Sequence, residues 1–396
     1  MVAWNVAGVL SKDNSFWEGM RECEIIGMSE TWLEEKDVGK IKKRLVKEYK
    51  WEVRVATREN VRGRAKGGMI VGVRKELNSV IEMIKDNICK IRISVNKVRW
   101  MIVFIYLGEE KQNDLEMIGR WVEEARDMSV LVLGDWNARL GKERGMVWQE
   151  REEMGRKSED LVINSQGKNV INWCKKHGLN GDFDGDEEGK CTFIGHGKTV
   201  LDYAVASGDA LEGLEELKVL EEVGSDHLPI RIKWKGKRLY KVRKMETKEA
   251  WDWSEEGVKN FRKNLRESEV KAKSWSELKE KIEKAMVKKE IKIKIGSVSE
   301  KWWNEQCFEK KQSYKKALSE WRSSNEGEKE RKFKKSRREY KEQVSKSKKE
   351  YGDRVIMELN RSKGLCEYWD IINRWRGKKR EGVNEEIDER QWVGHF

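Results

Sequence analysis

The feature that most constrains the fold is a series of short, β-branched apolar runs that ends near Lys235. Each run has the length of a strand, and helical patterns or Gly-Gly, Asn-Gly and Asp-Gly dipeptides separate them. The runs are Cys23–Met28, Trp51–Thr57, Gly68–Val73, Ile88–Val95, Met101–Leu107, Val130–Leu133, Val200–Ala206 and Leu228–Trp234. The helical patterns are Val38–Tyr49, Leu115–Arg126 and Gly167–His177. This alternation predicts a mixed α/β domain over residues 1–235, large enough for its own core.

Beyond Lys235 the strand signal fades and helical patterns dominate. The patterns cover Trp251–Leu265, Trp275–Val287 and a long stretch from Glu300 to Leu359. Within the long stretch, Tyr314, Ala317, Leu318 and Trp321 follow the spacing of one helix face. Packing between helices is the favoured explanation of this aromatic stripe, with stacking on nucleic-acid bases as the alternative. We therefore predict a mostly helical extension over residues 236–396.

The net charge of +13 is concentrated in this extension. Residues 237–396 hold 45 basic and 30 acidic residues, a net charge of +15, whereas residues 1–236 hold 39 basic and 41 acidic ones, a net charge of −2. A basic segment of this kind favours a phosphate polymer as its partner. A solvated, lysine-rich helical surface is the alternative explanation.

Several classes of protein fit the composition poorly. No apolar run approaches the ~20 residues needed to span a bilayer, and the start lacks a signal-peptide pattern. The six cysteines are scattered without a Cys-x-x-Cys pair, which argues against a disulfide framework or a structural zinc site. With 39% charged and 37% hydrophobic residues, one uniformly globular body is not expected either.

The strongest local signal is the segment Val130-Leu-Val-Leu-Gly-Asp135-Trp-Asn137. An apolar strand ends in glycine and then presents Asp135 and Asn137 two positions apart, so that both side chains can point to the same side. A carboxylate there can serve as a general base for water, and an amide can position water or a phosphate oxygen. Gly-Asp-x-Asn is also a common turn sequence.

A second signal combines Asp226, His227 and Asp202. Asp226 and His227 precede the chain's single proline and an apolar strand, which suits a metal ligand or a residue that orients an acid–base group. Asp202 lies inside an apolar run, where an unpaired carboxylate is costly. We expect it to pair with His227 and stabilise an imidazolium. The alternatives are a structural histidine and an aspartate at a strand edge that faces water.

Three further polar residues follow apolar runs. Asn5 and Glu30 each follow a short run near the start, and a glutamate at such a position is a hard oxygen ligand suited to Mg²⁺. Tyr106 ends the run that begins at Met101 and could direct its hydroxyl at a phosphate. Taken singly, Asn5 and Glu30 read as surface residues and Tyr106 as a core residue. Only four residues precede Asn5, so we expect a short first strand.

Together these residues gather at strand ends in one α/β domain, where such sheets keep their sites. Carboxylates, amides and one histidine suit metal-assisted hydrolysis of a phosphodiester. Acyl transfer is disfavoured because Gly-x-Ser-x-Gly is absent, and nucleotide hydrolysis because no phosphate-binding Gly-x4-Gly-Lys-Ser/Thr loop occurs.

The ordered set resembles the exonuclease–endonuclease–phosphatase superfamily, which includes the apurinic/apyrimidinic endonucleases and DNase I, over nearly all of residues 1–235. More narrowly, it resembles the endonuclease domain of non-LTR (LINE-type) retrotransposon polyproteins. The motifs that carry this likeness are Gly134-Asp-Trp-Asn-Ala-Arg-Leu-Gly, Asn164 with Gly167, Cys191-Thr-Phe-Ile, Leu201-Asp-Tyr, Lys301-Trp-Trp-Asn-Glu-Gln-Cys and Trp392-Val-Gly-His-Phe396. The resemblance implies a DNase I-like four-layer α/β sandwich, then a helical basic segment preceding a reverse transcriptase domain that this chain lacks.

The resemblance also implies a metal site. Glu30 would bind Mg²⁺, for which Mn²⁺ is a possible substitute, with Asn5 and Asp226 close to the metal or the phosphate. Thr192 would contact the phosphate.

The catalytic roles come from the same resemblance. Asp135 would activate water, and Asn137 would hold the phosphate. Asp202 and His227 would form the dyad that stabilises charge on the phosphate, and Tyr106 would assist there.

The implied reaction is a single-strand nick in DNA that leaves a 3′-hydroxyl to prime reverse transcription. The expected partners are DNA, element RNA through residues 237–396, and a polymerase domain in the full polyprotein; the expected location is the nucleus. Val200 stands where the repair enzymes commonly have a basic residue, which weakens an abasic-site activity. Two alternatives stay open: a phosphodiesterase of the same fold acting on abasic DNA, RNA or small phosphate esters, and a catalytically dead fragment that binds nucleic acid.

Overall fold

The computed structural model of the chain describes residues 1–58, 63–95, 97–108, 111–142, 158–180, 189–195, 197–235, 245–267, 274–294, 301–323 and 326–376. Contacts divide the chain into two compact units. The first comprises Met1–Leu220 and Ser225–Val298, and the second Glu221–Gly224 and Ser299–Phe396. The expected boundary near residue 236 and the motif at 392–396 lie outside the described residues.

The first unit contains a six-stranded sheet in the order β10-β11-β1-β2-β4-β3. Strands β1 and β2 are parallel, and the other neighbours are antiparallel. The strands are β10 (Leu214–Val219), β11 (Ile230–Trp234), β1 (Val2–Asn5), β2 (Ile25–Ser29), β4 (Met69–Arg74) and β3 (Tyr49–Arg54). Strand β1 is short, as expected, and its register places Asn5 beside Ser29, the residue before Glu30.

A second sheet has five strands in the order β5-β6-β7-β8-β9. Only β7 and β8 run parallel in it. Its strands are β5 (Val80–Lys85), β6 (Ile88–Val95), β7 (Val98–Tyr106), β8 (Ser129–Asp135) and β9 (Asp202–Ala206). Each apolar run singled out in the sequence is therefore a strand, although β5 and β10 were not predicted.

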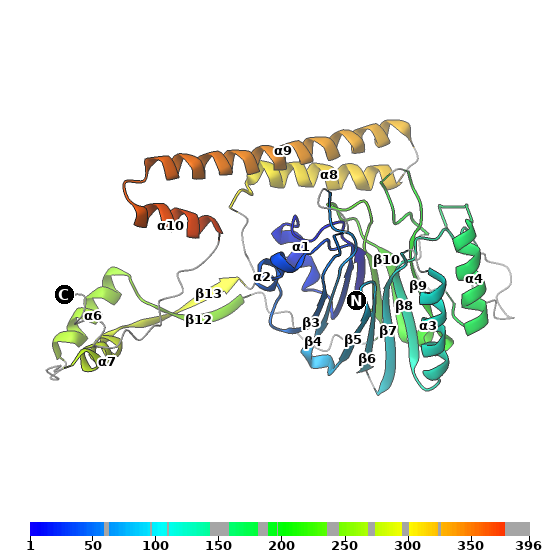
Figure 1. The fold of residues 1–396 in the computed structure, drawn as a ribbon, viewed down its shortest axis with the longest axis horizontal. Coiled ribbons are helices and arrows are strands. Elements are labelled where there is room, and N and C mark those ends of the chain that lie inside the picture. Colours follow the sequence, from blue (N-terminus) through cyan, green and yellow to red (C-terminus); the bar gives the residue numbers. More distant parts are fainter. Residues whose placement is uncertain are drawn as a thin grey trace. The chain divides into compact units, whose positions relative to one another are not determined.

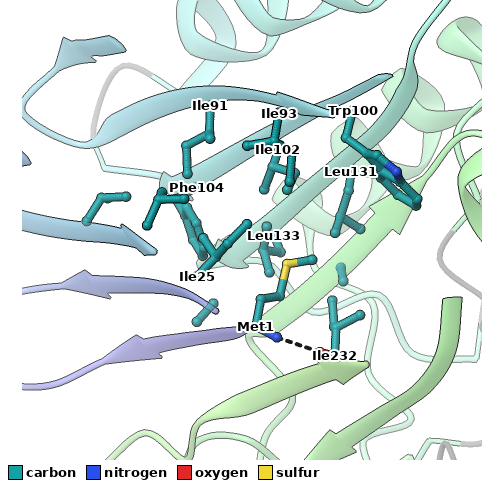
Figure 2. Close-up of a cluster of buried hydrophobic side chains, with 14 of the residues drawn as sticks. Met1, Ile25, Ile91, Ile93, Trp100, Ile102, Phe104, Leu131, Leu133 and Ile232 are labelled. Carbon is teal, nitrogen blue, oxygen red and sulfur yellow. Dashed lines mark hydrogen bonds between the residues drawn. The ribbon is translucent and has the colours of Figure 1, made fainter. Parts of the chain in front are cut away.

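The two sheets pack face to face. Between them lie buried side chains from both, with Ile25 and Ile232 on one sheet and Phe104 and Leu133 on the other. Figure 2 shows this layer, in which the amino group of Met1 donates a hydrogen bond to the carbonyl of Ile232 at 2.7 Å. Burial of aliphatic and aromatic surface here is the main stabilising term for the domain.

Helices cover both outer faces. Helix α1 (Asn14–Met20) and helix α2 (Val38–Lys42) pack on β1 and β2, whereas α3 (Lys111–Glu124) and α4 (Ser165–His177) pack on β7 and β8 (Figure 1). Short helical turns complete the unit: η1 (Glu35–Asp37), η2 (Lys75–Leu77) and α5 (Gly208–Gly213). The layers run helix, sheet, sheet, helix, which confirms the four-layer α/β sandwich.

One predicted helix is much shorter in the structure. The pattern Val38–Tyr49 gives a helix only to Lys42, and Tyr49 begins β3 instead. Pairing with β4 and the hydrogen bond from the Tyr49 hydroxyl to the Cys23 carbonyl, 2.5 Å long, outweigh the local helical pattern. The other two patterns were placed within a few residues of α3 and α4.

A hairpin and two helices follow in the first unit. Strand β12 (Met245–Trp251) pairs antiparallel with β13 (Lys288–Lys294), and α6 (Glu255–Glu267) and α7 (Trp275–Ala285) lie between them in the sequence. The two helices were predicted. The prediction that strands end near Lys235 was wrong, because β12 and β13 follow. In β13 only Ile291 and Ile293 alternate with charged residues, so the period-2 pattern is weak.

The second unit contains α8 (Glu305–Ser323), α9 (Gly327–Arg361) and α10 (Leu365–Arg376), where the sequence predicted one long helix and no α10. Aromatic rings join α8 to α9. The ring of Phe333 stacks on Trp321 at 4.6 Å and lies 5.4 Å from Tyr314. These contacts confirm helix packing, rather than base stacking, as the role of the aromatic stripe. Among the described residues, no helix has the length and apolar character of a membrane span.

Candidate active site

Strand ends bring the polar residues together. The register pairs Tyr106 with Asp135 across β7 and β8, and Asp135 with Asp202 across β8 and β9. Asn5 reaches the same place from the other sheet, because its side-chain amide donates to the Asp135 carboxylate at 2.9 Å. The facing ends of both sheets therefore form one polar site.

Gly134 fixes where Asp135 leaves the strand. Its φ is +140°, a conformation that L side chains rarely adopt. A β-carbon at this position would lie 2.1 Å from the Ile105 carbonyl oxygen. Only glycine therefore lets β7 and β8 pair up to the residue that carries the carboxylate.

Asp135 is the more deeply buried of the two aspartates beside His227, with 1% of its surface exposed. One carboxylate oxygen accepts from Asn5, and the other accepts from the backbone N–H of Asn137 at 3.0 Å. Burial, and then the charge of Asp202, raise its pKa to about 6, while the positive charge of His227 opposes the rise. Such a carboxylate is ionised at neutral pH and basic enough to accept a proton from water.

His227 lies between two carboxylates. Its Nδ1 is 2.8 Å from Asp202, and its Nε2 is 3.7 Å from Asp135. Burial alone would lower the pKa of the imidazole, but the charge and hydrogen bond of Asp202, followed by the charges of Asp135 and Asp226, raise it to about 9. The histidine is therefore an imidazolium at neutral pH, and the pairing expected from the sequence is present.

Three residues outside the predicted site hold this pair in place. The Ser225 hydroxyl donates to the Asn5 carbonyl at 2.7 Å and accepts from the His227 backbone N–H at 3.1 Å. The Trp4 indole donates to the His227 carbonyl, and the Phe193 ring meets the imidazole edge-on. Ser225 directly precedes the predicted site residue Asp226 in the sequence. Nothing in the sequence pattern, however, predicts its two hydrogen bonds.

Thr192 belongs to the same support. Its hydroxyl oxygen accepts from the backbone N–H groups of Leu201 and Asp202, both at 3.0 Å, and the residue is buried. The bond fixes the start of β9 and so the direction of the Asp202 side chain. Contact between Thr192 and a phosphate stays a prediction.

Asn137 and Tyr106 lie on the other side of Asp135. Asn137 has a φ of +46°, and its amide donates to the Leu107 carbonyl at 2.9 Å. The Tyr106 hydroxyl interacts with the Glu30 carboxylate and the Asn137 side chain. Burial and then the interaction with Glu30 raise the pKa of Tyr106, which keeps the hydroxyl protonated and able to donate.

Glu30 is held by a residue that the sequence did not reveal. The Trp32 indole N–H donates to the Glu30 carboxylate, and the Arg64 guanidinium lies over the indole, 4.2 Å from the ring centre. Both Glu30 and Trp32 have positive φ values, +50° and +51°. An indole two residues after a carboxylate carries no recognised motif, so only the fold shows this contact.

Among the described residues, two sets come into consideration as a cation site. Ligand atoms of Asp135, Asp202 and His227 lie within 4.8 Å of one another and are buried. A protonated imidazole has no lone pair to offer a metal, however. These three residues are therefore better described as two carboxylates around the His227 imidazolium. The oxygens of Glu30, Asn5 and Asp226 are the set whose chemistry fits a hard divalent ion.

Backbone contacts place that oxygen set at one edge. Asn5 lies beside Ser29 in the parallel pair, and Ser225 links the Asn5 carbonyl to the segment that holds Asp226. Asp226 itself is half-buried, and its backbone carbonyl accepts from Ile194 at 2.8 Å. The fold therefore brings all nine predicted residues to one region, although the role of each stays a prediction.

One family model matches the part of the chain that contains this site. Residues 100–231 match the model of a family described as endonuclease-reverse transcriptase. The match covers about a third of the chain, and this part is similar to the endonucleases of that family. It contains Asp135, Asp202 and His227 together.

Solved structures similar to this chain share low sequence identity with it. The AP endonuclease LMAP of Leishmania major is 14% identical, with 58% of this chain and 86% of that chain covered and a TM-score of 0.45. The endonuclease domain of TRAS1, a telomere-specific non-LTR retrotransposon, is 16% identical, with 58% and 94% covered and a TM-score of 0.42. The 3′ phosphatase NExo from Neisseria, bound to product DNA hairpin, is 15% identical, with 59% and 98% covered and a TM-score of 0.42. No curated protein matches the chain.

Proposed function

We propose that the chain is a Mg²⁺-dependent DNA endonuclease of a non-LTR retroelement. The observation that carries the proposal is the buried Asp135 carboxylate, held between the Asn5 amide and the His227 imidazolium at the meeting ends of two sheets. Its position inside the segment that matches the endonuclease-reverse transcriptase family supports the same activity.

Asp135 is the proposed general base. Its two hydrogen bonds fix the carboxylate, and a pKa of about 6 suits proton acceptance from the attacking water. The proton passes from water to the Asp135 carboxylate as the water oxygen forms its bond to phosphorus. The bond between phosphorus and the 3′ oxygen then breaks, and this oxygen takes a proton from solvent to become the 3′-hydroxyl, so that one strand of the duplex is cut.

His227 and Asn137 are the proposed donors to the phosphate. The imidazolium offers a charged N–H to a non-bridging oxygen whose negative charge grows in the transition state. The Asn137 amide carries a second N–H besides the one bound to Leu107. Asp202 holds the imidazole in orientation and keeps it charged, and Tyr106 supplies a further hydroxyl donor.

Glu30, with Asn5 and Asp226 nearby, is the proposed holder of Mg²⁺. The bound ion would supply charge neutralisation at the phosphate and at the leaving oxygen. Mn²⁺ is a possible substitute because it accepts the same oxygen ligands.

The proposed substrate is duplex DNA, and the proposed product end is a 3′-hydroxyl that primes reverse transcription. In a full polyprotein a polymerase domain would extend that end along element RNA, in the nucleus. The net charge of +15 on residues 237–396 supports a nucleic-acid partner for the extension.

The test is nicking of supercoiled plasmid, with Mg²⁺ or with EDTA, followed by extension of the product with a DNA polymerase. The proposal expects open circles only with Mg²⁺, and ends that the polymerase extends without prior phosphatase treatment. Open circles formed in EDTA, or ends that need phosphatase first, would contradict it. A parallel duplex with one abasic site separates this activity from a repair-type one, which would cut the abasic duplex and spare the plasmid.

A further inference from the structure

Helix α6 carries a basic face beside an exposed tryptophan. The face borders an open cavity of about 720 Å³ in the part of the first unit built from β12, β13, α6 and α7. Its lining includes Trp253, Lys259, Arg262, Lys263, Arg266 and Glu267. None of these residues belongs to the site around Asp135.

The charge of this face is positive and open to solvent. Lys259, Arg262, Lys263 and Arg266 follow the i, i+3, i+4, i+7 spacing of one helix face, and all four are exposed. They extend over about 10 Å of the helix axis at ~1.5 Å per residue. Two glutamates share the lining, and Lys263 lies 3.8 Å from Glu267 in a solvent-exposed contact, which is weak. The face therefore keeps a net positive charge.

Trp253 is exposed although its backbone is fixed. The side chain is 70% exposed, far more than packing of so large an apolar ring would leave. Before it, the Asp252 N–H donates to the Val287 carbonyl at 2.8 Å, and the Asp252 carboxylate accepts from Lys289 at 2.7 Å. After it, the Ser254 hydroxyl caps α6 through the Gly257 N–H. The backbone on both sides of Trp253 is therefore fixed, and its exposed indole borders the same cavity as the four cations.

We propose that this face of α6 binds single-stranded nucleic acid, with a base stacked on Trp253 and backbone phosphates on the four cations. Stacking on an aromatic side chain needs a base whose face is open, which a single strand offers and an intact duplex does not. An acidic peptide would use the cations but not the indole. The site lies beyond the proposed nuclease function and does not depend on it, because it shares no residue with the site around Asp135.

The experiment measures binding without cleavage. The full chain carrying Asp135→Ala is titrated, in EDTA, into fluorescein-labelled 15-nucleotide oligouridine and oligothymidine, and anisotropy gives Kd at several salt concentrations. Trp253→Ala is expected to weaken binding at least about fivefold, the low end for loss of one stacked base. The double change Arg262→Ala with Lys263→Ala is expected to lower the slope of log Kd against log salt by about 1.4.

Helix α7 offers matched controls. Trp275 is 72% exposed and Lys279 is exposed as well, but neither lines the cavity. Trp275→Ala and Lys279→Ala are expected to change Kd less than about twofold. Thermal unfolding of each variant, with the same Tm as the parent, excludes loss of the fold; if Trp253→Ala lowers Tm, the change of salt slope in the arginine–lysine variant decides.

Binding to both oligomers supports a general single-strand site, and stronger binding to oligouridine assigns the site to RNA. The proposal is overturned if Trp253→Ala keeps the parent Kd with an unchanged Tm. Equal losses from Trp253→Ala and Trp275→Ala would overturn it too. None of these outcomes depends on metal or cleavage, so a failed nicking assay leaves this test intact.

Discussion

His227 and Asp135 control each other's charge. Their Nε2 and Oδ2 atoms lie 3.7 Å apart, and Asp202 holds the other imidazole nitrogen at 2.8 Å. Two buried carboxylates around one imidazolium keep the histidine protonated while Asp135 is ionised. Over that pH range the site holds a base and a charged donor side by side, as hydrolysis of a phosphodiester requires.

The pH dependence of nicking follows from these two residues. Asp135 acts as base only when ionised, so the rate should rise through pH ~6, and His227 donates only when protonated, so it should fall through pH ~9. Asp202→Asn removes the main group that raises the His227 pKa, so the alkaline limb should move to lower pH. Rates measured from pH 5 to 10 check this.

Asp114→Asn is the control for that profile. Asp114 lies on α3 and is another buried acid, with its carboxylate 2.7 Å from the Lys85 ammonium. Its replacement should leave both limbs of the pH profile in place. An alkaline limb that stays near pH 9 in Asp202→Asn would show that His227 does not set it.

Trp32 should influence metal affinity through Glu30. The indole N–H donates to the Glu30 carboxylate, so Trp32→Phe frees the carboxylate to rotate. Loss of such an outer contact typically costs 10–100-fold in metal affinity. We expect the Mg²⁺ concentration for half-maximal nicking, and for half of the Mg²⁺-dependent rise in Tm, to increase about tenfold.

Trp51→Phe is the matched control for Trp32→Phe. The Trp51 indole also donates one hydrogen bond, to the Val46 carbonyl at 2.9 Å, away from the site. It should leave both Mg²⁺ midpoints unchanged. Equal midpoints in the two variants would refute the positioning role of Trp32.

For single residues, the sequence predicts which ones form the site better than it predicts the hydrogen bonds that hold them. The motifs point to the nine residues because each follows an apolar run or stands in a recognisable segment. The bonds from Trp32, Ser225 and Thr192 join positions whose relation depends on register and side-chain direction, neither of which a single sequence encodes visibly. Sequence reasoning therefore names the site but not its supports.

At the element scale, burial decides which strands could be foreseen. Strands β4, β7 and β8 have continuous runs of apolar, β-branched residues and are buried on both faces. Such strands are easily recognised in the sequence. Strands β5 and β10 are partly solvated and carry charged residues at alternate or adjacent positions, which hides the period. In the sequence of β13 only Ile291 and Ile293 stand among charged residues, so its period is weak as well. Tyr49 shows sheet pairing overriding a helical pattern.

Gly134 allows β7 and β8 to pair up to their ends. Gly134→Ala would place a methyl group 2.1 Å from the Ile105 carbonyl at an unfavourable φ, separating the ends of β7 and β8. Strain of this kind costs about 1–3 kcal/mol. We expect a lower Tm and at least a hundredfold loss of nicking, measured by thermal unfolding and plasmid relaxation.

Gly108→Ala serves as the control, because a β-carbon there meets no atom within 4 Å. It should keep the parent Tm and rate. Normal nicking by Gly134→Ala would show that this strand end tolerates displacement.

The whole molecule combines two units, each with its own core. The first is built around the paired sheets, and the second around the aromatic contacts of α8 and α9. The positive charge resides in residues 237–396, while residues 1–236 are near neutral. The sequence predicted this division of charge, but not the hairpin that places residues 245–294 in the first unit.

Separate cores should melt separately. Leu318→Ala leaves a cavity where a fully buried side chain stood in α8, at a cost of about 2–5 kcal/mol. Calorimetry should show one transition shifted and the other unchanged, with nicking at 25 °C within about twofold of the parent. Leu133→Ala, in the core between the sheets, should shift the other transition. A single transition moved by both substitutions would contradict two independent units.

We propose that Asp135 and His227 together hydrolyse the phosphodiester. The measurement that tests it most directly is the initial rate of Mg²⁺-dependent plasmid nicking by Asp135→Asn and His227→Gln, beside the parent and Asp114→Asn. Each site variant should lose at least about a thousandfold in rate at an unchanged Tm, because the base or the charged donor is gone while the packing remains. Asp114→Asn should nick at the parent's rate. Nicking that persists in both site variants, in folded protein, would place the chemistry elsewhere.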